Sequence, residues 1–313
     1  MRYRVYSEYL RQRYGEKVYK LPVSLPVTCP NRDGTCGVSG CVFCGEIGAG
    51  YENLPAEMTV AEQLAANIAH IAPKYKAQKF IAYFQNFSNT YMQPDKFADY
   101  LRQACRPGVV GVAVATRPDC VGDRHLEAMA EVRAAHNVDI FLELGLQTVN
   151  FHSLLKVNRG HTLAEFIDAV LRTKRFGVEI CAHIILNLPW DDMTDAIEDA
   201  KVLSALGVEQ VKLHALYIVK GTVMADWYTR GEVNLISKEE YVERVVTFLE
   251  YLHPVIVVQR LIGRAPASHT LFANWQSGWW TIRDDIERLM EERDTRQGRL
   301  CRYLGGAAAG KFL

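Results

Sequence analysis

Four cysteines in one loop are the residues best suited to chemistry in this sequence. Cys29, Cys41 and Cys44 follow the spacing C-x11-C-x2-C, and several glycines between them give the loop conformational freedom. Three thiolates at this spacing can hold a [4Fe–4S] cluster and leave one iron without a protein ligand, which is a place for chemistry. Because Cys36 lies in the same loop, a structural zinc site with four thiolates is an alternative. The spacing by itself leaves both metal sites open.

Strand-like segments alternate with helix-like segments along most of the chain. Amphipathic runs such as residues 60–72 and 163–176 separate apolar runs, which is the pattern of repeated βα units. Parallel strands joined by right-handed helical crossovers close toward a barrel, and the ligand site lies at the carboxyl ends of the strands. The sequence therefore predicts an α/β barrel with strands near residues 21–28, 80–85, 109–116, 139–147, 179–189, 210–219 and 255–262.

Polar or turn residues follow the predicted strands at their carboxyl ends. The thiols follow the first strand, and the segments QNFSNT, TRPD, GLQT and NLP follow the second to the fifth. Because the carboxyl ends of parallel strands meet at one edge of a sheet, these segments are expected to share an active site. Glu143 and Gln147 are four positions apart on one strand, so both should face the barrel interior. A glutamate there is rarely buried without a purpose.

The composition is that of a well-packed protein without a dominant charge. The 313 residues are 49% hydrophobic and 23% charged, with 36 basic and 36 acidic side chains. A net charge of zero excludes a global field that recruits nucleic acid or membrane, so an RNA contact would need a local patch. No apolar run reaches the roughly 20 residues of a membrane span, and residues 1–20 lack the apolar stretch of a signal peptide. We therefore expect a cytoplasmic protein without membrane contact.

The cysteine loop, with Phe43 directly before the last cysteine, resembles the cluster loop of radical S-adenosylmethionine (SAM) enzymes. The segments ELGLQTVNFHSLLKVNRGHTLAEF and FGVEICAHIILNLP resemble the radical SAM domain of Elongator's catalytic subunit, and the order of CPNRDGT, TRPDC, ELGLQT, NRGHT and VKGT is similar to the stand-alone YhcC and YtqA group. The likeness covers nearly the whole chain. It implies a partial (βα)6-type TIM-like barrel over residues 21–235, a basic N-terminal helix in residues 1–20 and a small C-terminal extension in residues 236–313.

The same resemblance implies two cofactors and the residues that bind them. Cys29, Cys41 and Cys44 would hold a [4Fe–4S] cluster, and the amino and carboxylate groups of SAM would chelate its open iron. A reduced cluster would cleave SAM to methionine and a 5′-deoxyadenosyl radical, which abstracts hydrogen from a substrate in the barrel. The implied cofactor contacts are Phe43 near the adenine, Asn86 and Ser88 near the amino group, Gln147 and Arg159 near the methionyl part, His183 near the ribose, and Thr116 and Glu143 beside them.

Fewer features bear on the substrate. Lys212, His214, Lys220 and Arg260 lie on or after the last predicted strands, and a basic residue there suits an anionic substrate. Because the nearest named relatives act on tRNA, the resemblance implies modification of a tRNA wobble uridine. It also implies two partners, tRNA and a one-electron reductant of flavodoxin or ferredoxin type. Two alternatives stay open: a radical SAM enzyme acting on a protein or a metabolite, and a non-catalytic zinc-binding RNA-interaction protein that depends on Cys36.

The N-terminus allows two interpretations. Residues 1–20 carry six basic side chains against two glutamates, with five tyrosines interleaved. This composition suits contacts with phosphates and bases. It also suits a first helix that plugs the barrel and covers apolar surface with the stems of its long side chains.

Overall fold

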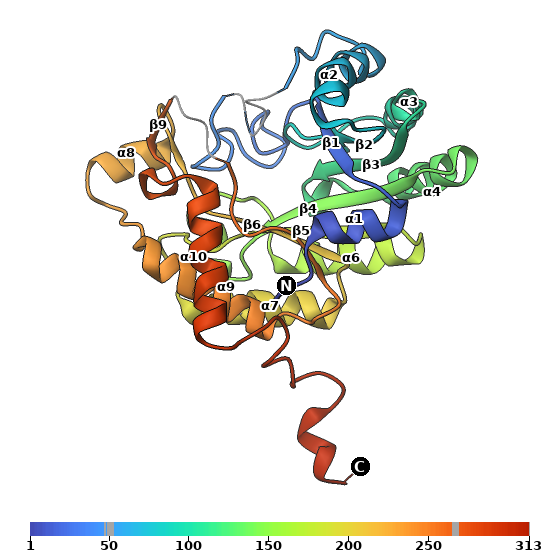
Figure 1. Cartoon of the computed structure of the whole chain (residues 1–313). Coiled ribbons are helices and arrows are strands. Elements are labelled where there is room, and N and C mark those ends of the chain that lie inside the picture. Colours follow the sequence, from blue (N-terminus) through green and yellow to red (C-terminus); the bar gives the residue numbers. More distant parts are fainter. Residues whose placement is uncertain (47, 49–52, 265–268, 313) are drawn as a thin grey trace.

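A single curled sheet organises the computed structural model, which describes residues 1–46, 48, 53–264 and 269–312. Its seven strands are all parallel and run in the order β1-β2-β3-β4-β5-β6-β8, forming a half-barrel (Figure 1). The expected α/β barrel is thereby confirmed. The strands of this sheet are β1 (Val18–Val23), β2 (Lys79–Phe84), β3 (Val109–Thr116), β4 (Asp139–Gln147), β5 (Glu179–Ile185), β6 (Gln210–His214) and β8 (Val257–Arg260).

The helices mostly connect successive strands and cover the outside of the sheet, except for the first one, which packs at the amino end of the barrel (Figure 1). They are α1 (Tyr6–Tyr14), α2 (Val60–Tyr75), α3 (Pro94–Ala104), α4 (Asp123–His136), α5 (Phe151–Lys156), α6 (Leu163–Arg175), α7 (Met193–Leu206), α8 (Val223–Thr229), α9 (Lys238–Tyr251) and α10 (Trp279–Glu292), with short 3₁₀ turns η1 (Pro118–Cys120), η2 (Asn274–Gln276) and η3 (Ala307–Phe312). Strands β7 (Ile218–Val219) and β9 (Thr270–Phe272) form a separate antiparallel pair. None of the described helices is long and apolar enough to cross a membrane.

Local sequence signals fix the starts of two predicted helices. Thr59 accepts a hydrogen bond from the backbone N–H of Glu62, whose carboxylate bonds back to Thr59, so a complete capping box opens α2. Thr162 and Glu165 form a second capping box at the start of α6. Both helices begin where the periodicity of the sequence places them, and α6 ends at Arg175, directly before Phe176 and Gly177.

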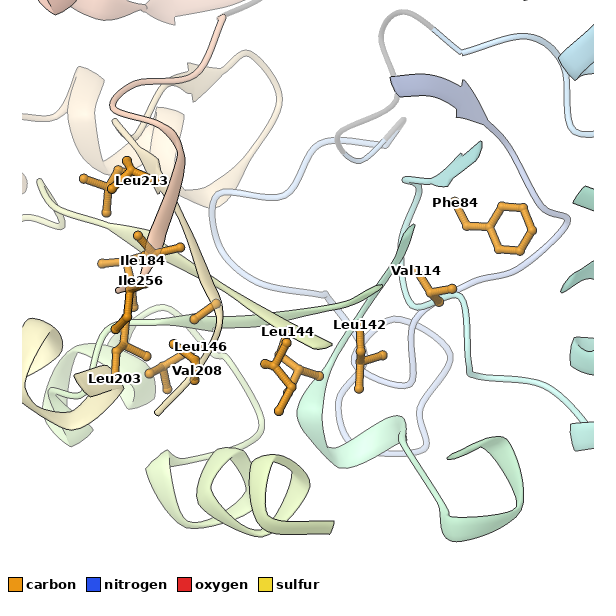
Figure 2. Packing of buried hydrophobic residues seen from close by; sticks show 14 of the residues in the cluster. Phe84, Val114, Leu142, Leu144, Leu146, Ile184, Leu203, Val208, Leu213 and Ile256 are labelled. Carbon is orange, nitrogen blue, oxygen red and sulfur yellow. The ribbon is translucent and has the colours of Figure 1, made fainter. Parts of the chain in front are cut away.

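The alternation of side chains along β4 separates the core from the barrel interior. Leu142, Leu144 and Leu146 are buried in the main hydrophobic core, where Figure 2 shows them together with Ile184 of β5 and Leu213 of β6. The intervening Glu143, Gly145 and Gln147 line a cavity instead. A period of two therefore gives β4 one apolar face for packing and one face for chemistry.

The first strand lies a few residues earlier than the sequence predicts. Pairing with β2 runs from Val18 to Val23, whereas the strand was expected near residues 21–28. After the end of the strand, the backbone is hydrogen-bonded to Gln63 of α2. The Gln63 side chain accepts from the backbone N–H of Ser24 at 2.8 Å and donates to the carbonyl of Ser24 at 2.8 Å. The backbone beyond Val23 is thus satisfied by a helix side chain rather than by a neighbouring strand.

Helix α1 closes the amino end of the barrel. Leu10 packs against Ile81, Ala113 and Phe141 from three strands. Arg13 forms ion pairs with Asp139 and Glu179, the first residues of β4 and β5. The structure therefore gives the basic N-terminus the plugging role that its composition allowed.

Residues beyond 235 contribute to the same sheet. Strand β8 is its seventh strand, and α9 packs against α7 and α10. A backbone bridge also joins Val5, ahead of α1, to Val258 of β8. The division of the chain at residues 20 and 235 stays a prediction.

Candidate active site

One cavity of about 550 Å³ inside the half-barrel brings together most of the residues singled out in the sequence. They come from the cysteine loop, defined here as residues 29–44, and from the ends of β3 to β6 and β8. The predicted residues that line the cavity are Cys29, Cys41, Phe43, Cys44, Thr116, Glu143, Gln147, Arg159, His183, Lys212, His214 and Arg260.

The thiols of the cysteine loop divide into a set of three and an outlier. Cys29, Cys41 and Cys44 all line the cavity, and Cys41 is buried. Burial raises the pKa of Cys44 to about 11, and the neighbouring Cys41 adds to this rise. Cys36, in contrast, is exposed and does not line the cavity. The geometry therefore matches a three-thiolate site rather than a four-thiolate one.

The cysteine loop is fastened to the segment that follows α5. The N–H of Val42 donates to the carbonyl of Val157 at 3.0 Å, and the side chain of Asn158 donates to the carbonyl of Gly40 at 2.8 Å. The side chain of Asn31 donates in turn to the carbonyl of Asn158. These bonds bring Arg159, the next residue in the chain, to the thiols.

Arg159 presents a guanidinium group beside the buried thiol. Its Nη1 lies 3.5 Å from Sγ of Cys41, and its Nη2 donates to the carbonyl of Gly145 at 2.6 Å. A Cβ at position 145 would lie 2.8 Å from Nη2 of Arg159, so Gly145 leaves room for the guanidinium in this position. The Nε of Arg159 is buried without a hydrogen-bond partner among the residues that the structure describes. This donor is unsatisfied within the protein, so an acidic ligand in the cavity would complete it.

Gln147 and Thr116, the last residues of β4 and β3, also line the cavity. Gln147 adopts a left-handed backbone conformation with φ of 81° next to a register shift between β4 and β5. Such a conformation costs about 1–3 kcal/mol in a non-glycine residue, and these conformations cluster at functional sites. Thr116 shares hydrogen bonds with the hydroxyls of Ser88 at 2.8 Å and Thr90 at 2.7 Å. Ser88 thus supports Thr116 from behind.

A network of charged and polar side chains around Glu143 lines another part of the cavity. We call it the Glu143 network, and its members are Lys20, Tyr83, Glu143, His183, Lys212 and Gln259. The carboxylate is fully buried and binds the ammonium groups of Lys20 and Lys212, as well as His183 at 2.9 Å. Burial would raise the pKa of Glu143, but Lys20 and Lys212 bring it well below the usual value. Glu143 is therefore an ionised counter-ion for the buried Lys212 and the partly buried Lys20.

The other charges of the Glu143 network are tuned by burial. Burial lowers the pKa of Lys212 to about 8, although Glu143 opposes the shift. Burial, together with the charge of Lys212, also lowers the pKa of His183 to about 4, so this imidazole is neutral at pH 7. The ring of Tyr83 lies between two ammonium groups, 4.5 Å from Lys212 and 4.8 Å from Lys20. Its hydroxyl accepts from Lys212 at 3.1 Å.

Comparison with known families identifies the chain. The family model described as the radical SAM superfamily matches residues 27–203, and the model of the radical SAM C-terminal domain matches residues 208–292. The chain belongs to the radical SAM superfamily.

Curated relatives extend over almost its full length. It is 33% identical to the protein YtqA of Bacillus subtilis over 97% of this chain and 94% of the relative, and 32% identical to the protein YhcC of Escherichia coli K12 over 94% of each chain. A tRNA uridine(34) acetyltransferase of Methanocaldococcus jannaschii is 24% identical over 50% of this chain and 28% of the relative.

Solved structures show the same fold. The Elp3 protein of Methanocaldococcus infernus superposes with a TM-score of 0.69 at 15% identity, covering 90% of this chain and 64% of that one. Methylornithine synthase (PylB) superposes with a TM-score of 0.51 at 13% identity, covering 96% of this chain and 88% of the synthase. At these identities the likeness establishes the architecture alone.

Three predicted residues of this radical SAM protein lie outside the cavity lining. Ser88 is buried behind Thr116, as described above, and Asn86 keeps a buried side-chain oxygen without a partner. Lys220 is exposed in the turn between β7 and α8, where its N–H donates to the carbonyl of His269 at 2.8 Å. Their assignment to the site stays a prediction.

Sequence reasoning did not single out three other residues at the radical SAM cavity. They are Arg32 and Tyr83, which line it, and Lys20, which reaches Glu143 from 123 positions away. Phe87 and Arg117 also line the cavity, and they lie in the segments QNFSNT and TRPD that were expected there. Tyr83 follows Ile81 with a period of two, so the alternation in β2 could have found it. Arg117 directly follows β3, at the end where the ligand site was expected. Nothing in the sequence marks Lys20 as a residue of the site, because only the packing of distant strands brings it to Glu143.

Proposed function

We propose that this radical SAM protein binds a [4Fe–4S] cluster through Cys29, Cys41 and Cys44 and cleaves SAM reductively. One observation carries the proposal: these three thiols and the partly unsatisfied Arg159 line one cavity at the carboxyl ends of the strands. When bound, the cluster and SAM together supply a 5′-deoxyadenosyl radical that abstracts a hydrogen atom. The protein supplies binding, orientation and the exclusion of water.

The residues of the chain have distinct parts in this proposal. Arg159 binds the carboxylate of SAM, because its buried Nε lacks a partner and a guanidinium suits a carboxylate. Gln147 and the neutral His183 offer hydrogen bonds to the methionyl part and the ribose, and Phe43 lies against the adenine. Glu143 holds Lys212 in place rather than contacting SAM, since both of its oxygens bind lysines.

A zinc site with four thiolates is less well supported. It needs Cys36 as the fourth ligand, and Cys36 is exposed and outside the cavity lining that the other three thiols share. The proposal includes a flavodoxin- or ferredoxin-type protein as electron donor, and a cytoplasmic location, in which such donors work.

For the substrate we propose the wobble uridine of a tRNA. Similarity to a tRNA uridine(34) acetyltransferase supports this choice, as does a cavity whose charged lining residues are mostly cationic. A protein or metabolite substrate is the alternative within the same chemistry. Mass spectrometry of nucleosides from tRNA incubated with the reconstituted protein distinguishes them: a mass change at the wobble uridine supports the tRNA substrate, and unchanged tRNA under conditions that cleave SAM contradicts it.

The central test compares two cysteine variants under anaerobic conditions. Wild type, Cys29→Ala and Cys36→Ala are reconstituted with iron and sulfide, reduced and incubated with SAM, and 5′-deoxyadenosine is quantified. We expect product from wild type and Cys36→Ala and none from Cys29→Ala, because Cys29 lines the cavity and Cys36 does not. Zinc binding that requires Cys36, without SAM cleavage in any protein, would overturn the proposal.

A further inference from the structure

The cavity concentrates positive charge in a chain whose net charge is zero. Of the residues that the structure describes, one carboxylate, Glu143, lines it together with six cationic side chains: Arg32, Arg117, Arg159, Lys212, Arg260 and Arg264. Such an excess in a confined space attracts anions and strengthens each interaction with them.

Several of these cations already have acceptors within the protein. Arg117 forms an ion pair with Asp119 at 2.6 Å, and Lys212 binds Glu143. Arg32 donates to the carbonyl of Gly45 at 2.9 Å. Arg159 lies beside Cys41 and belongs to the SAM site proposed above. Arg260 differs from all of these.

Among the residues that the structure describes, Arg260 has a neutral partner and no carboxylate. Its Nη2 lies 2.7 Å from Nδ1 of His214, and its Nε is buried without a hydrogen-bond partner in that part of the chain. Burial and the charge of Arg260 itself hold the pKa of His214 well below the usual value, so the imidazole accepts a hydrogen bond without offering negative charge. The guanidinium is therefore held in place and left electrostatically uncompensated by this contact.

The backbone around Arg260 is shaped to hold the guanidinium at the cavity. A Cβ on Gly263 would lie 3.2 Å from its Nη2, so the glycine leaves room for the group. Asn274 donates to the carbonyl of Gly263 at 3.0 Å and fixes this turn. On the sheet, Arg260 of β8 is the register partner of Lys212 of β6. A second cationic side chain thus lies on the neighbouring strand.

We propose that Arg260, oriented by His214, binds an anionic group of the substrate, a carboxylate or a phosphate. The forked donors of a guanidinium suit both groups, and the buried Nε supplies a donor that no acceptor in residues 1–46, 48, 53–264 and 269–312 uses. The site is separate from Arg159, which lies at the cysteine loop. The inference rests on the proposed function in one respect only, because it takes the bound anionic group to be part of the enzyme's substrate.

Binding of two simple anions tests this site. The melting temperature of the reconstituted protein, loaded with SAM and kept without reductant, is measured in inorganic phosphate, in glutarate and in chloride at equal ionic strength. A ligand that binds only the folded state raises the melting temperature. The comparison includes Arg260→Gln, Arg260→Lys and a matched control, Arg283→Gln, whose guanidinium pairs with Asp284 on the surface helix α10.

We expect phosphate or glutarate to raise the melting temperature of wild type and Arg283→Gln above the chloride value. Arg260→Gln should weaken binding about tenfold or more, the usual effect of losing a charge-assisted hydrogen bond. Arg260→Lys should bind with intermediate strength, and it serves as the test protein if Arg260→Gln does not fold. Selectivity for phosphate would indicate a phosphorylated substrate, and selectivity for glutarate a carboxylate. An equal rise in wild type and Arg260→Gln, or no rise above chloride in wild type, would overturn the inference.

Repeating the titration in Cys29→Ala separates this inference from the proposed function. If Arg260-dependent anion binding persists there while wild type cleaves no SAM, the proposed function fails and the anion site stands. If wild type cleaves SAM but binds the anions independently of Arg260, the anion site alone fails.

Discussion

The cysteine loop and the Glu143 network line the same cavity but are built in opposite ways. The three thiols lie close together in the sequence, on a loop that main-chain and asparagine hydrogen bonds fasten to the segment after α5. The Glu143 network joins charged side chains from β1, β4 and β6 with neutral polar ones from β5 and β8. Removal of a thiol should therefore affect chemistry, whereas removal of a network charge should affect the stability of the fold.

The largest effect on stability should come from Glu143→Gln. The change removes the counter-ion of the buried Lys212 and of the partly buried Lys20, and breaking a buried ion pair costs about 3–5 kcal/mol. Urea unfolding at pH 7 measures this loss. Cys44→Ala, measured without iron, should change the free energy of unfolding by about 1 kcal/mol or less, since the thiol makes only weak contacts. Equal losses of unfolding free energy in the two variants would contradict the proposed difference between the Glu143 network and the cysteine loop.

The pH dependence of the Glu143→Gln effect has a definite sign. Burial would raise the pKa of Glu143, but Lys20 and Lys212 hold it well below the usual value in the folded protein. A carboxyl group with a lowered pKa stabilises the fold above its unfolded pKa of about 4.3 and loses this contribution at lower pH. The difference in unfolding free energy between wild type and variant should thus be constant from about pH 5 to 7 and shrink below about pH 4. A difference that grows in acid would contradict this assignment.

A smaller effect, confined to ligand binding, should follow from Arg159→Gln. Loss of the guanidinium should weaken SAM binding about 10- to 100-fold, the range for a hydrogen bond to a charged group. Equilibrium binding of SAM to the reconstituted, unreduced protein measures it. Arg283→Gln is the control, and unchanged SAM affinity in Arg159→Gln would remove Arg159 from the site.

The smallest effect should come from Arg13→Gln in the barrel plug. Its ion pairs with Asp139 and Glu179 are partly exposed, so we expect the free energy of unfolding to fall by about 1 kcal/mol. Affinity for tRNA, measured by filter binding, should not change, because these contacts already occupy the guanidinium. A marked loss of tRNA affinity at unchanged stability would instead give the N-terminal helix an RNA-binding role.

The sequence by itself determined the architecture and the cysteine loop. Periodicity and capping boxes at Thr59 and Thr162 are local signals, so helices α2 and α6 and the βα alternation could be predicted. The spacing of Cys29, Cys41 and Cys44 is local too, since the three proposed cluster ligands lie on one loop. The alternation along β4 also placed Glu143 and Gln147 on the interior face correctly.

The tertiary structure alone decided which charges meet and which thiol stands apart. Lys20 reaches Glu143, and Arg260 meets His214 rather than a carboxylate, only because the sheet curls and brings β1, β4, β6 and β8 around one cavity. Cys36 could be separated from the other thiols only by its exposure. The physical reason is that sequence patterns record the face of an element, whereas the partner of a buried charge depends on how distant elements pack.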